Sequence, residues 1–436
     1  MHWKTTYQTK LLTAQEAVRK IQSGNRIFLT GNCSTPRLLL EALLAYAPEV
    51  KDLTIYHALL VAGSEYVAPE MQGHIRVNTL FISANVREAV NQGKADFTPV
   101  LLSEFPTLFS SGVIPLDIAL VHLSPPDQDG YCTFGIESGL TKTAAQAAKA
   151  IIAEINPQMP TTIGDTRIHI NDLDYIVEVN YRLAELPQKY ESGQDVVDKI
   201  GQNISQLIPD GATLQLGIGG IPNAVLSYLK DKNDLGIHSE LFSDGLIDLV
   251  NSGNITGKAK SIHKDKIIAG FVIGSNNLYK WVDKNPLIEF HCTEYINDPF
   301  IIAKNDRMVA INSAIEIDFT GQVCADSIGT KLYSGIGGQL DFIYGASRSK
   351  GGIPIIALPS SARLKNGQFI SKINPTLKTG AGITVTRNQI HYVVTEFGAV
   401  NLYGKSIRER TQLLISIAHP QFRDELIDKA REMKYV

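Results

Sequence analysis

The sequence has few cysteines and no clustered metal-binding residues. Four cysteines occur in 436 residues, far apart and without CxxC spacing: Cys33, Cys132, Cys292 and Cys324. The ten histidines form no HxxxH or similar pair. We therefore expect no metal site. Cys33 lies in the turn GNCSTPRLL without a visible catalytic partner, so we interpret it as a turn or buried residue and not as a nucleophile.

The sequence also lacks an excess of charge of one sign and a long apolar run. Its formal net charge is -3, so it has no global basic field that would attract a nucleic acid, and an anionic ligand must be held by a local site. The first residues, MHWKTTYQTK, are polar, and no run of 18 apolar residues follows. We expect neither a signal peptide nor a membrane span, and a cytoplasmic setting.

The composition and patterning that are present indicate an α/β protein. A chain of 436 residues with 44% hydrophobic residues can fill two or three domains. Apolar, β-rich runs alternate with helical stretches along the whole sequence. The pattern predicts helices at 13–23, 139–155 and 408–418, and strands at 26–31, 53–60, 77–83, 117–124, 213–219, 267–274, 308–317, 353–360 and 391–398.

The two halves of the sequence contain a similar pattern. Residues 27–43 and 214–229 both contain a strand pattern, a glycine, a short turn with proline five residues after the glycine, and an apolar helix pattern. This similarity indicates a duplication. A polar, proline-marked stretch at 183–195 separates the halves. We place an N-terminal α/β domain at 1–187 and a C-terminal α/β domain at 188–436.

The most informative motif pair lies in the second half. The glycine-rich turn GIGGIPNAV (217–225) is followed, about one helix later, by HSELFSD (238–244). A strand-turn-helix-strand unit would bring the turn and Glu240 to the carboxyl edge of one sheet, where open α/β folds bind ligands. Two chemistries fit. In a dinucleotide-binding domain Glu240 would hold a ribose hydroxyl, and in an acyl-transfer enzyme it would attack a thioester.

The glycine pattern argues against the dinucleotide. A Rossmann turn needs its third glycine five residues after the first, and here that position is Pro222, which suits a helix start. A second loop, GIGGQLDF (335–342), has Leu340 at the same position. Two such loops are better explained by one different site, although a purely structural tight turn stays open for either loop alone.

Several long motifs occur in one order along nearly the whole chain. They are GKADFTPVLLSEFP (93–106), DIALVHLSPPDQDGYCTFG (117–135), GIGGIPNAV, HSELFSDG, NSAIEID (312–318), GIGGQLDF and VTEFGAVNLYGKS (394–406). In this order the sequence resembles the acetyl-CoA hydrolase/transferase group of family I coenzyme A transferases. The resemblance implies two similar open α/β domains (NagB/RpiA/CoA transferase-like) with the active site between them. It also implies coenzyme A or acyl-CoA as substrate and no permanently bound cofactor.

The implied activity is transfer of CoA between a short-chain acyl-CoA, such as acetyl-CoA, and a carboxylic acid, such as 4-hydroxybutyrate. By resemblance, Glu240 would carry CoA as a glutamyl-CoA thioester in a ping-pong mechanism. An ordinary glutamate is ionised at pH 7, so this nucleophile needs no activating base. Acetyl-CoA hydrolysis, transfer between butyryl-CoA and acetate, and a non-catalytic CoA-sensing protein stay open as alternatives.

The candidate binding residues lie mainly on the two glycine loops. Gln215 and Gly217 are candidate donors to the oxyanion, although Gln215 could instead be a plain inward-facing strand residue. CoA contacts are expected from Gly217, Ile218, Gly219, Gly220, Ile221, Ile315, Gly335, Gly337, Gly338 and Gln339. Glu294 and Glu396 are rival carboxylates, and Lys365 and Lys372 could meet the CoA phosphates. Besides these small molecules we expect a second copy of the chain as partner, in a homodimer.

Overall fold

The computed structural model describes residues 2–61, 63–186, 194–364 and 366–436. The chain divides into two compact units. The first comprises residues 1–187 and 268–296, and the second comprises residues 188–267 and 297–436. The predicted boundary between residues 187 and 188 lies outside the described residues.

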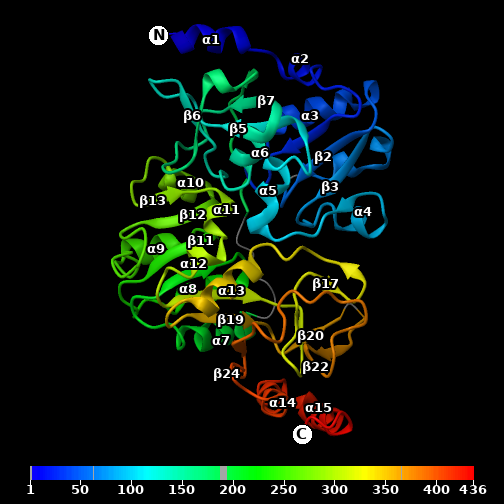
Figure 1. The fold of residues 1–436 in the computed structure, drawn as a ribbon, viewed down its shortest axis with the longest axis vertical. Helices are drawn as coiled ribbons and strands as arrows, with labels where there is room; N and C mark the ends of the chain where they lie inside the picture. The colour runs from blue at the N-terminus through cyan, green and yellow to red at the C-terminus, as the bar shows by residue number, and fades with distance from the viewer. Residues whose placement is uncertain (1, 62, 187–193, 365) are drawn as a thin grey trace. The chain divides into compact units, whose positions relative to one another are not determined.

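The first unit is built on a seven-stranded parallel sheet, drawn from blue to green in Figure 1. The strand order is β4-β3-β2-β1-β5-β7-β9. The first strand therefore lies between β2 and β5, which makes this position the topological switch point of the sheet. The strands are β1 (Arg26–Leu29), β2 (Leu53–His57), β3 (Ile75–Thr79), β4 (Asp96–Phe97), β5 (Leu116–Leu123), β7 (Ala148–Ile155) and β9 (Tyr175–Glu178).

Short helices and a small ribbon complete the first unit. The first part of the unit holds α1 (His2–Lys10), α2 (Ala14–Val18), α3 (Arg37–Tyr46), α4 (Arg87–Asn91), α5 (Phe105–Ser110), α6 (Thr141–Ala147) and the antiparallel pair β6 (Tyr131–Thr133) and β8 (Arg167–His169). The later segment of the unit holds β12 (Ile267–Val272), α10 (Asn276–Val282), β13 (Ile288–Phe290) and α11 (Thr293–Ile296). A capping box between Thr13 and Glu16 fixes the start of α2. The helix predicted at 13–23 begins there but ends at residue 18.

The helix predicted at 139–155 is wrong in its second half. α6 ends at Ala147, and β7 begins at the next residue. β7 pairs in parallel with β5 on one side and β9 on the other, and residues 151–155 are buried. Pairing on both edges and burial outweigh the helix propensity of the alanine-rich sequence, which is a weak preference per residue.

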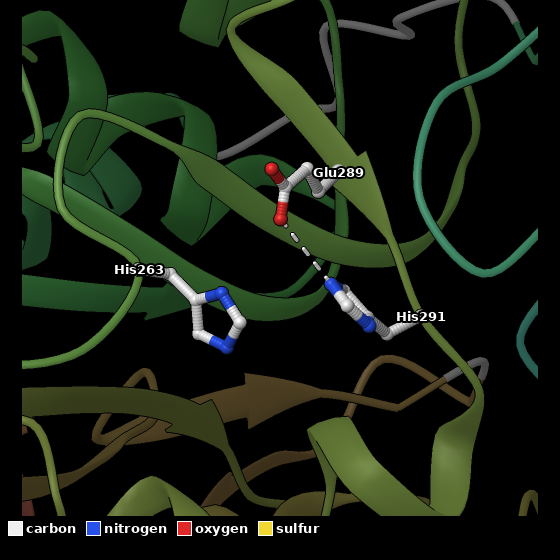
Figure 2. A group of neighbouring side chains, drawn as sticks. All are labelled: His263, Glu289 and His291. Atoms are coloured by element: carbon white, nitrogen blue, oxygen red, sulfur yellow. Dashed lines mark ion pairs between the residues drawn. The ribbon is translucent and has the colours of Figure 1, made fainter.

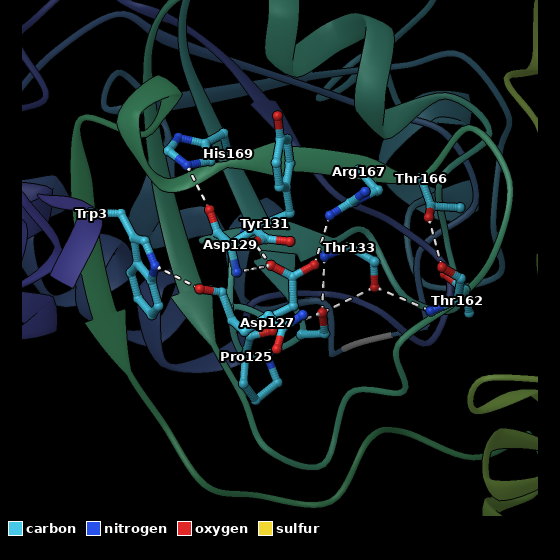
Figure 3. Close-up of polar contacts among 12 residues, drawn as sticks. Trp3, Pro125, Asp127, Asp129, Tyr131, Thr133, Thr162, Thr166, Arg167 and His169 are labelled. Carbon is cyan, nitrogen blue, oxygen red and sulfur yellow. Dashed lines mark hydrogen bonds and ion pairs between the residues drawn. The ribbon is translucent and has the colours of Figure 1, made fainter. Parts of the chain in front are cut away.

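The motif at 117–135 forms β5 and then a loop closed by its own hydrogen bonds (Figure 3). The Asp127 carboxylate accepts hydrogen bonds from the backbone N–H groups of Asp129 and Tyr131, each at 2.9 Å. It also accepts one from the Arg167 guanidinium at 2.6 Å. The Trp3 indole donates to the carbonyl of residue 128 at 3.1 Å. These polar residues therefore order the loop within the first unit.

The second unit is built on a sheet with the order β11-β10-β14-β19-β23-β24, drawn from green to orange in Figure 1. β10 lies between β11 and β14, as β1 lies between β2 and β5. The segments at 27–43 and 214–229 thus occupy equivalent places, and the prediction of two similar open α/β domains is confirmed. The strands are β10 (Thr213–Leu216), β11 (Gly236–Phe242), β14 (Met308–Ser313), β19 (Ile353–Ala357), β23 (Tyr392–Thr395) and the antiparallel β24 (Gly398–Asn401).

The remaining elements of the second unit lie before, between and after these strands along the chain. Its helices are α7 (Gln194–Ser205), α8 (Gly220–Ser227), α9 (Gly245–Asn251), α12 (Pro299–Ile302), α13 (Gln339–Arg348), α14 (Ile407–Ser416) and α15 (Pro420–Glu432). Its short strands are β15 (Glu316–Asp318), β16 (Val323–Cys324), β17 (Ser327–Ile328), β18 (Lys331–Leu332), β20 (Ser361–Arg363), β21 (Phe369–Ser371) and β22 (Ile373–Asn374). None of the helices in the described ranges is long and apolar enough to cross a membrane.

The strand predicted at 308–317 is interrupted. β14 ends at Ser313, and β15 begins at Glu316. β14 pairs with β10 and β19 in the large sheet, whereas β15 pairs with β16 and β22 in a small one. The change of sheet requires the break, which the prediction of one continuous strand did not include.

Candidate functional site

Glu240 lies at an irregularity of β11. Leu214 of β10 pairs with Ile237, but Leu216 pairs with Leu241. Two steps along β10 therefore correspond to four along β11, and the extra residues form a bulge that contains Glu240. Bulges next to active sites redirect side chains that a regular strand would place differently.

Hydrogen bonds of Ser239 hold this bulge. Its hydroxyl accepts a hydrogen bond from the backbone N–H of Leu216 at 3.2 Å. The same hydroxyl lies 3.0 Å from the carbonyl oxygen of Leu216 and 2.7 Å from that of Leu241. Ser239 is buried, and its hydroxyl bonds with backbone groups of β10 and β11 that a regular strand pair would bond to each other. The position of Glu240 is therefore fixed by its neighbour in the sequence.

The Glu240 carboxylate meets the start of α13. It accepts hydrogen bonds from the backbone N–H of Gly338 and from the side-chain amide of Asn297. A Cβ atom on Gly338 would lie 2.3 Å from Oε2 of Glu240 and 2.4 Å from Nδ2 of Asn297. Only glycine at residue 338 therefore lets the helix N-terminus approach the carboxylate this closely, and a helix N-terminus favours negative charge.

The surroundings raise the pKa of Glu240 from 4.5 to about 7. Burial is the largest cause, and the negative charge of Asp341 adds to it. The hydrogen bonds from Asn297 and Gly338 act in the opposite direction. These surroundings therefore favour the protonated form of Glu240 more than water favours that of an ordinary glutamate.

The first glycine loop connects β10 to α8. Gln215 is buried, and its Oε1 accepts hydrogen bonds from the backbone N–H of Ile311 at 3.1 Å and from Nδ2 of Asn312 at 3.0 Å. Its side-chain oxygen thus ties β10 to β14. Gly219 has φ +115°, a conformation that favours glycine, and it precedes the first residue of α8.

The predicted contacts of this first loop differ in exposure. Gly217 is partly exposed, Ile218, Gly219 and Gly220 are exposed, and Ile221 is buried. The roles of these five residues in binding CoA, and of Gln215 and Gly217 as oxyanion donors, stay predictions.

The second glycine loop contacts Glu240 through Gly338. Gly337 has φ +58°, and Gly338 is the residue before α13. Gln339 donates from Nε2 to the Ser313 carbonyl at 2.7 Å, which ties the start of α13 to the end of β14. The structure thus brings Gly338 to the predicted nucleophile. The CoA contacts predicted for Gly335, Gly337, Gly338 and Gln339 stay predictions.

Ile315 lies in the break between β14 and β15. Its side chain is partly exposed, and its backbone N–H donates to the Cys324 carbonyl at 2.8 Å. This bond continues the small sheet and leaves the predicted contact of Ile315 with CoA as a prediction.

Two residues of the site were not identified from the sequence. Asn297 and Asp341 are both buried, and Nδ2 of Asn297 donates to Oδ2 of Asp341 at 3.4 Å. Asp341 lies within the motif GIGGQLDF, which was predicted to belong to the site. The motif does not predict the contact of Asp341 with Asn297. Asn297 lies 57 residues after Glu240 in YINDP, and no local pattern connects the two.

The rival carboxylates have other partners. Glu294 accepts a hydrogen bond from the Thr143 hydroxyl at 2.7 Å in the first unit. Glu396 accepts two from Ser360, at 2.8 Å from its backbone N–H and at 2.6 Å from its hydroxyl. Burial lowers the pKa of Lys372, and the charge of Glu396 opposes that shift. Lys365 lies outside the described residues.

Cys33 is buried, and burial raises the pKa of its thiol, which disfavours the reactive thiolate. Glu289 and His291 form an ion pair at 3.5 Å in the first unit (Figure 2). His263, also drawn there, belongs to the second unit. The absence of a resident metal stays a prediction.

Comparison with known proteins gives matches along both units. The family model described as acetyl-CoA hydrolase/transferase N-terminal domain matches residues 1–185, and the corresponding C-terminal domain model matches residues 274–430. A 4-hydroxybutyrate coenzyme A transferase of Clostridium kluyveri is 47% identical over 99% of this chain and 100% of its own length.

Two further relatives extend this result. A succinyl-CoA:acetate/propanoyl-CoA:succinate CoA transferase of Fasciola hepatica is 42% identical over 93% of this chain and 84% of its own. The crystal structure of a 4-hydroxybutyrate CoA-transferase from Porphyromonas gingivalis superposes with a TM-score of 0.85 at 39% identity, covering 99% of this chain and 100% of that one.

Proposed function

Because the chain belongs to the acetyl-CoA hydrolase/transferase family and is a CoA transferase, we propose that Glu240 is the nucleophile that carries CoA between its substrates. The proposed donor is a short-chain acyl-CoA such as acetyl-CoA, and the proposed acceptor is 4-hydroxybutyrate. The name of the relative at 47% identity supports this acceptor. A cytoplasmic setting, a homodimer and the lack of a resident cofactor are part of the proposal.

The proposed reaction proceeds through two acyl exchanges. The ionised Glu240 carboxylate attacks the thioester carbonyl of the acyl-CoA, the C–S bond breaks, and a mixed anhydride and CoA thiolate form. The thiolate then attacks the glutamyl carbonyl of the anhydride, which releases the free carboxylate and leaves a glutamyl-CoA thioester. The same steps in reverse with the second acid complete the transfer. No step consumes water.

The observation that carries the proposal is the contact of Glu240 with the N-terminus of α13. A partly exposed carboxylate that accepts hydrogen bonds from the Gly338 N–H and the Asn297 amide is held in one orientation. A carboxylate with a pKa raised to about 7 is also more basic than an ordinary glutamate, and basicity favours nucleophilic attack. Gln215 and Gly217 are the proposed donors to the oxyanion that forms on the substrate carbonyl.

Steady-state transfer from acetyl-CoA to 4-hydroxybutyrate tests the proposal. Glu240→Ala should reduce transfer by about 10³-fold or more, because it removes the attacking group. Glu294→Ala is the matched control, because it removes a rival carboxylate from the first unit. The melting temperature of each variant establishes that it is folded. A folded Glu240→Ala protein that keeps more than a few per cent of the activity would reject this assignment.

Acetyl-CoA hydrolysis is the second candidate, since the family model covers hydrolases as well as transferases. Water that reached the glutamyl-CoA thioester would convert transfer into hydrolysis. Release of CoA from acetyl-CoA, measured with and without an acceptor acid, separates the two. A transferase shows slow CoA release without acceptor, and a hydrolase shows the same rate in both conditions.

A further inference from the structure

A second carboxylate, that of Asp341, lies close to the partly exposed Glu240. Asp341 is 1% exposed and belongs to the first turn of α13, three residues after Gly338. The Asn297 amide donates to Asp341 at 3.4 Å and also donates to Glu240. One buried amide group therefore bridges the buried carboxylate of Asp341 and the partly exposed carboxylate of Glu240.

Two like charges at such a bridge repel each other strongly. Repulsion between carboxylates grows as the local dielectric constant falls, and it favours loss of one of the two charges. The negative charge of Asp341 raises the pKa of Glu240 and so disfavours its ionised form.

We propose that Asp341 is a positioning residue that destabilises the free Glu240 carboxylate relative to its covalent thioester. The inference rests on the proposed role of Glu240 as nucleophile. When Glu240 becomes an anhydride or a thioester, it no longer carries a negative charge. The repulsion from Asp341 then disappears, and the Asn297 amide donates to only one charged carboxylate, that of Asp341. The charge of Asp341 thereby drives the first half of the reaction towards the enzyme-bound intermediate.

A purely structural role for Asp341 makes different predictions. As an acceptor for Asn297, the residue would hold the amide in place whether or not it carried charge. Asp341→Asn keeps the shape and an acceptor oxygen but removes the charge, so a structural role would leave the chemistry of Glu240 nearly unchanged. Asp341→Glu retains the charge and should restore part of any effect that depends on it.

The test is the equilibrium of the half-reaction in which enzyme and acetyl-CoA give glutamyl-CoA enzyme and acetate. Quenched mixtures at several ratios of acetyl-CoA to acetate are analysed by intact mass. Asp341→Asn should lower the equilibrium constant for thioester formation by about tenfold, which corresponds to one pKa unit of Glu240. The pH profile of kcat/KM should move to lower pH in the same variant, because the Glu240 carboxylate ionises more easily.

Asp318→Asn is the matched control. Asp318 is also buried in the second unit, and its carboxylate accepts hydrogen bonds from the backbone N–H groups of Thr320 at 2.9 Å and Gln322 at 3.0 Å. Loss of this charge should reduce stability without moving either readout. If Asp341→Asn does not fold, Asp341→Ser provides a second uncharged variant. An unchanged equilibrium constant and pH profile in a folded, uncharged variant would overturn the inference. Failure of the wild-type protein to form any thioester would instead reject the proposed function.

Discussion

The charge of one carboxylate, Glu240, connects the stability of the protein with its chemistry. Burial and the charge of Asp341 raise its pKa to about 7, so the group is protonated in mildly acidic solution. An ionised carboxylate is needed for attack on a thioester. The rate constant kcat/KM for the half-reaction with acetyl-CoA should therefore rise with pH and level off above an apparent pKa near 7. A profile that is flat from about pH 5 to 8 would show that Glu240 titrates like an ordinary glutamate.

The same pKa predicts a pH-dependent difference in stability between the wild-type protein and Glu240→Gln. The pKa of the group is about 7 in the folded state and 4.5 as its ordinary value. Between these values the unfolded chain releases the proton first, so the wild-type protein loses stability as the pH rises. The variant has no such proton. Its free energy of unfolding relative to wild type should increase by about 3 kcal/mol between about pH 4.5 and pH 8.

Chemical denaturation of both proteins at several pH values measures this difference. Glu137 and Glu154 are also buried with pKa values raised to about 7, but they are present in both proteins and cancel in the comparison. A constant difference across the pH range would contradict the raised pKa of Glu240.

The sequence predicts Glu240 as the nucleophile but does not predict the raised pKa of its carboxylate. That prediction rests on the motif of Glu240 and on the glycine turn before it. Its pKa depends on Asn297 and Asp341, which lie 57 and 101 residues later in the chain. These groups come together only because the start of α13 lies against β11, and no spacing of residues in the sequence predicts that contact.

At the scale of elements, the approach of α13 depends on Gly338. Gly338→Ala should reduce transfer by at least tenfold, because the new Cβ would lie 2.3 Å from the Glu240 carboxylate and 2.4 Å from the Asn297 amide. Displacement of either group disturbs the attack geometry. Steady-state kinetics and the melting temperature distinguish this loss from unfolding.

Gly245→Ala is a suitable control for that variant. Gly245 is the first residue of α9, and a Cβ there would lie 3.0 Å from Cδ1 at the flexible end of Leu226 and 3.9 Å from Oδ1 of Asn223. We expect its transfer rate to remain within about twofold of wild type. If Gly338→Ala were equally active, the close contact between α13 and Glu240 would not be needed for catalysis.

Each of the nine strand ranges predicted from the sequence overlaps a strand of the structure, and the wrong predictions have structural causes. The ranges 26–31 and 53–60 contain β1 and β2, and the range 117–124 overlaps β5, because most residues of these parallel strands are apolar and buried. The pattern at 139–155 predicted one helix where α6 is followed by β7. Alanine-rich segments favour a helix locally, and only the neighbours β5 and β9 select the strand.

At the scale of the whole molecule, the order of motifs identified the family, and family membership is confirmed along nearly the whole chain. The acyl specificity is a separate question, because relatives with different substrates in their names share the fold and much of the sequence. The motifs around Glu240 do not distinguish between the acids named for these relatives.

We expect short monoanionic acids to be the preferred acceptors. Transfer from acetyl-CoA should be efficient with 4-hydroxybutyrate, butyrate and propionate and poor with succinate, because a second carboxylate needs a cationic partner or solvent. The screen compares kcat/KM for the four acids at equal donor concentration. Succinate as the best acceptor would contradict this prediction and would point to an activity like that named for the relative from Fasciola hepatica.

If Glu240 carries CoA as a thioester, the intermediate can be trapped chemically. The protein is incubated with acetyl-CoA without an acceptor and then treated with borohydride, which reduces a thioester but not a free carboxylate. We expect inactivation only after acetyl-CoA has been added, with conversion of Glu240 to an alcohol in the peptide that contains HSELFSDG. The absence of substrate-dependent inactivation, or modification at Glu294 or Glu396 in place of Glu240, would reject Glu240 as the carrier of CoA.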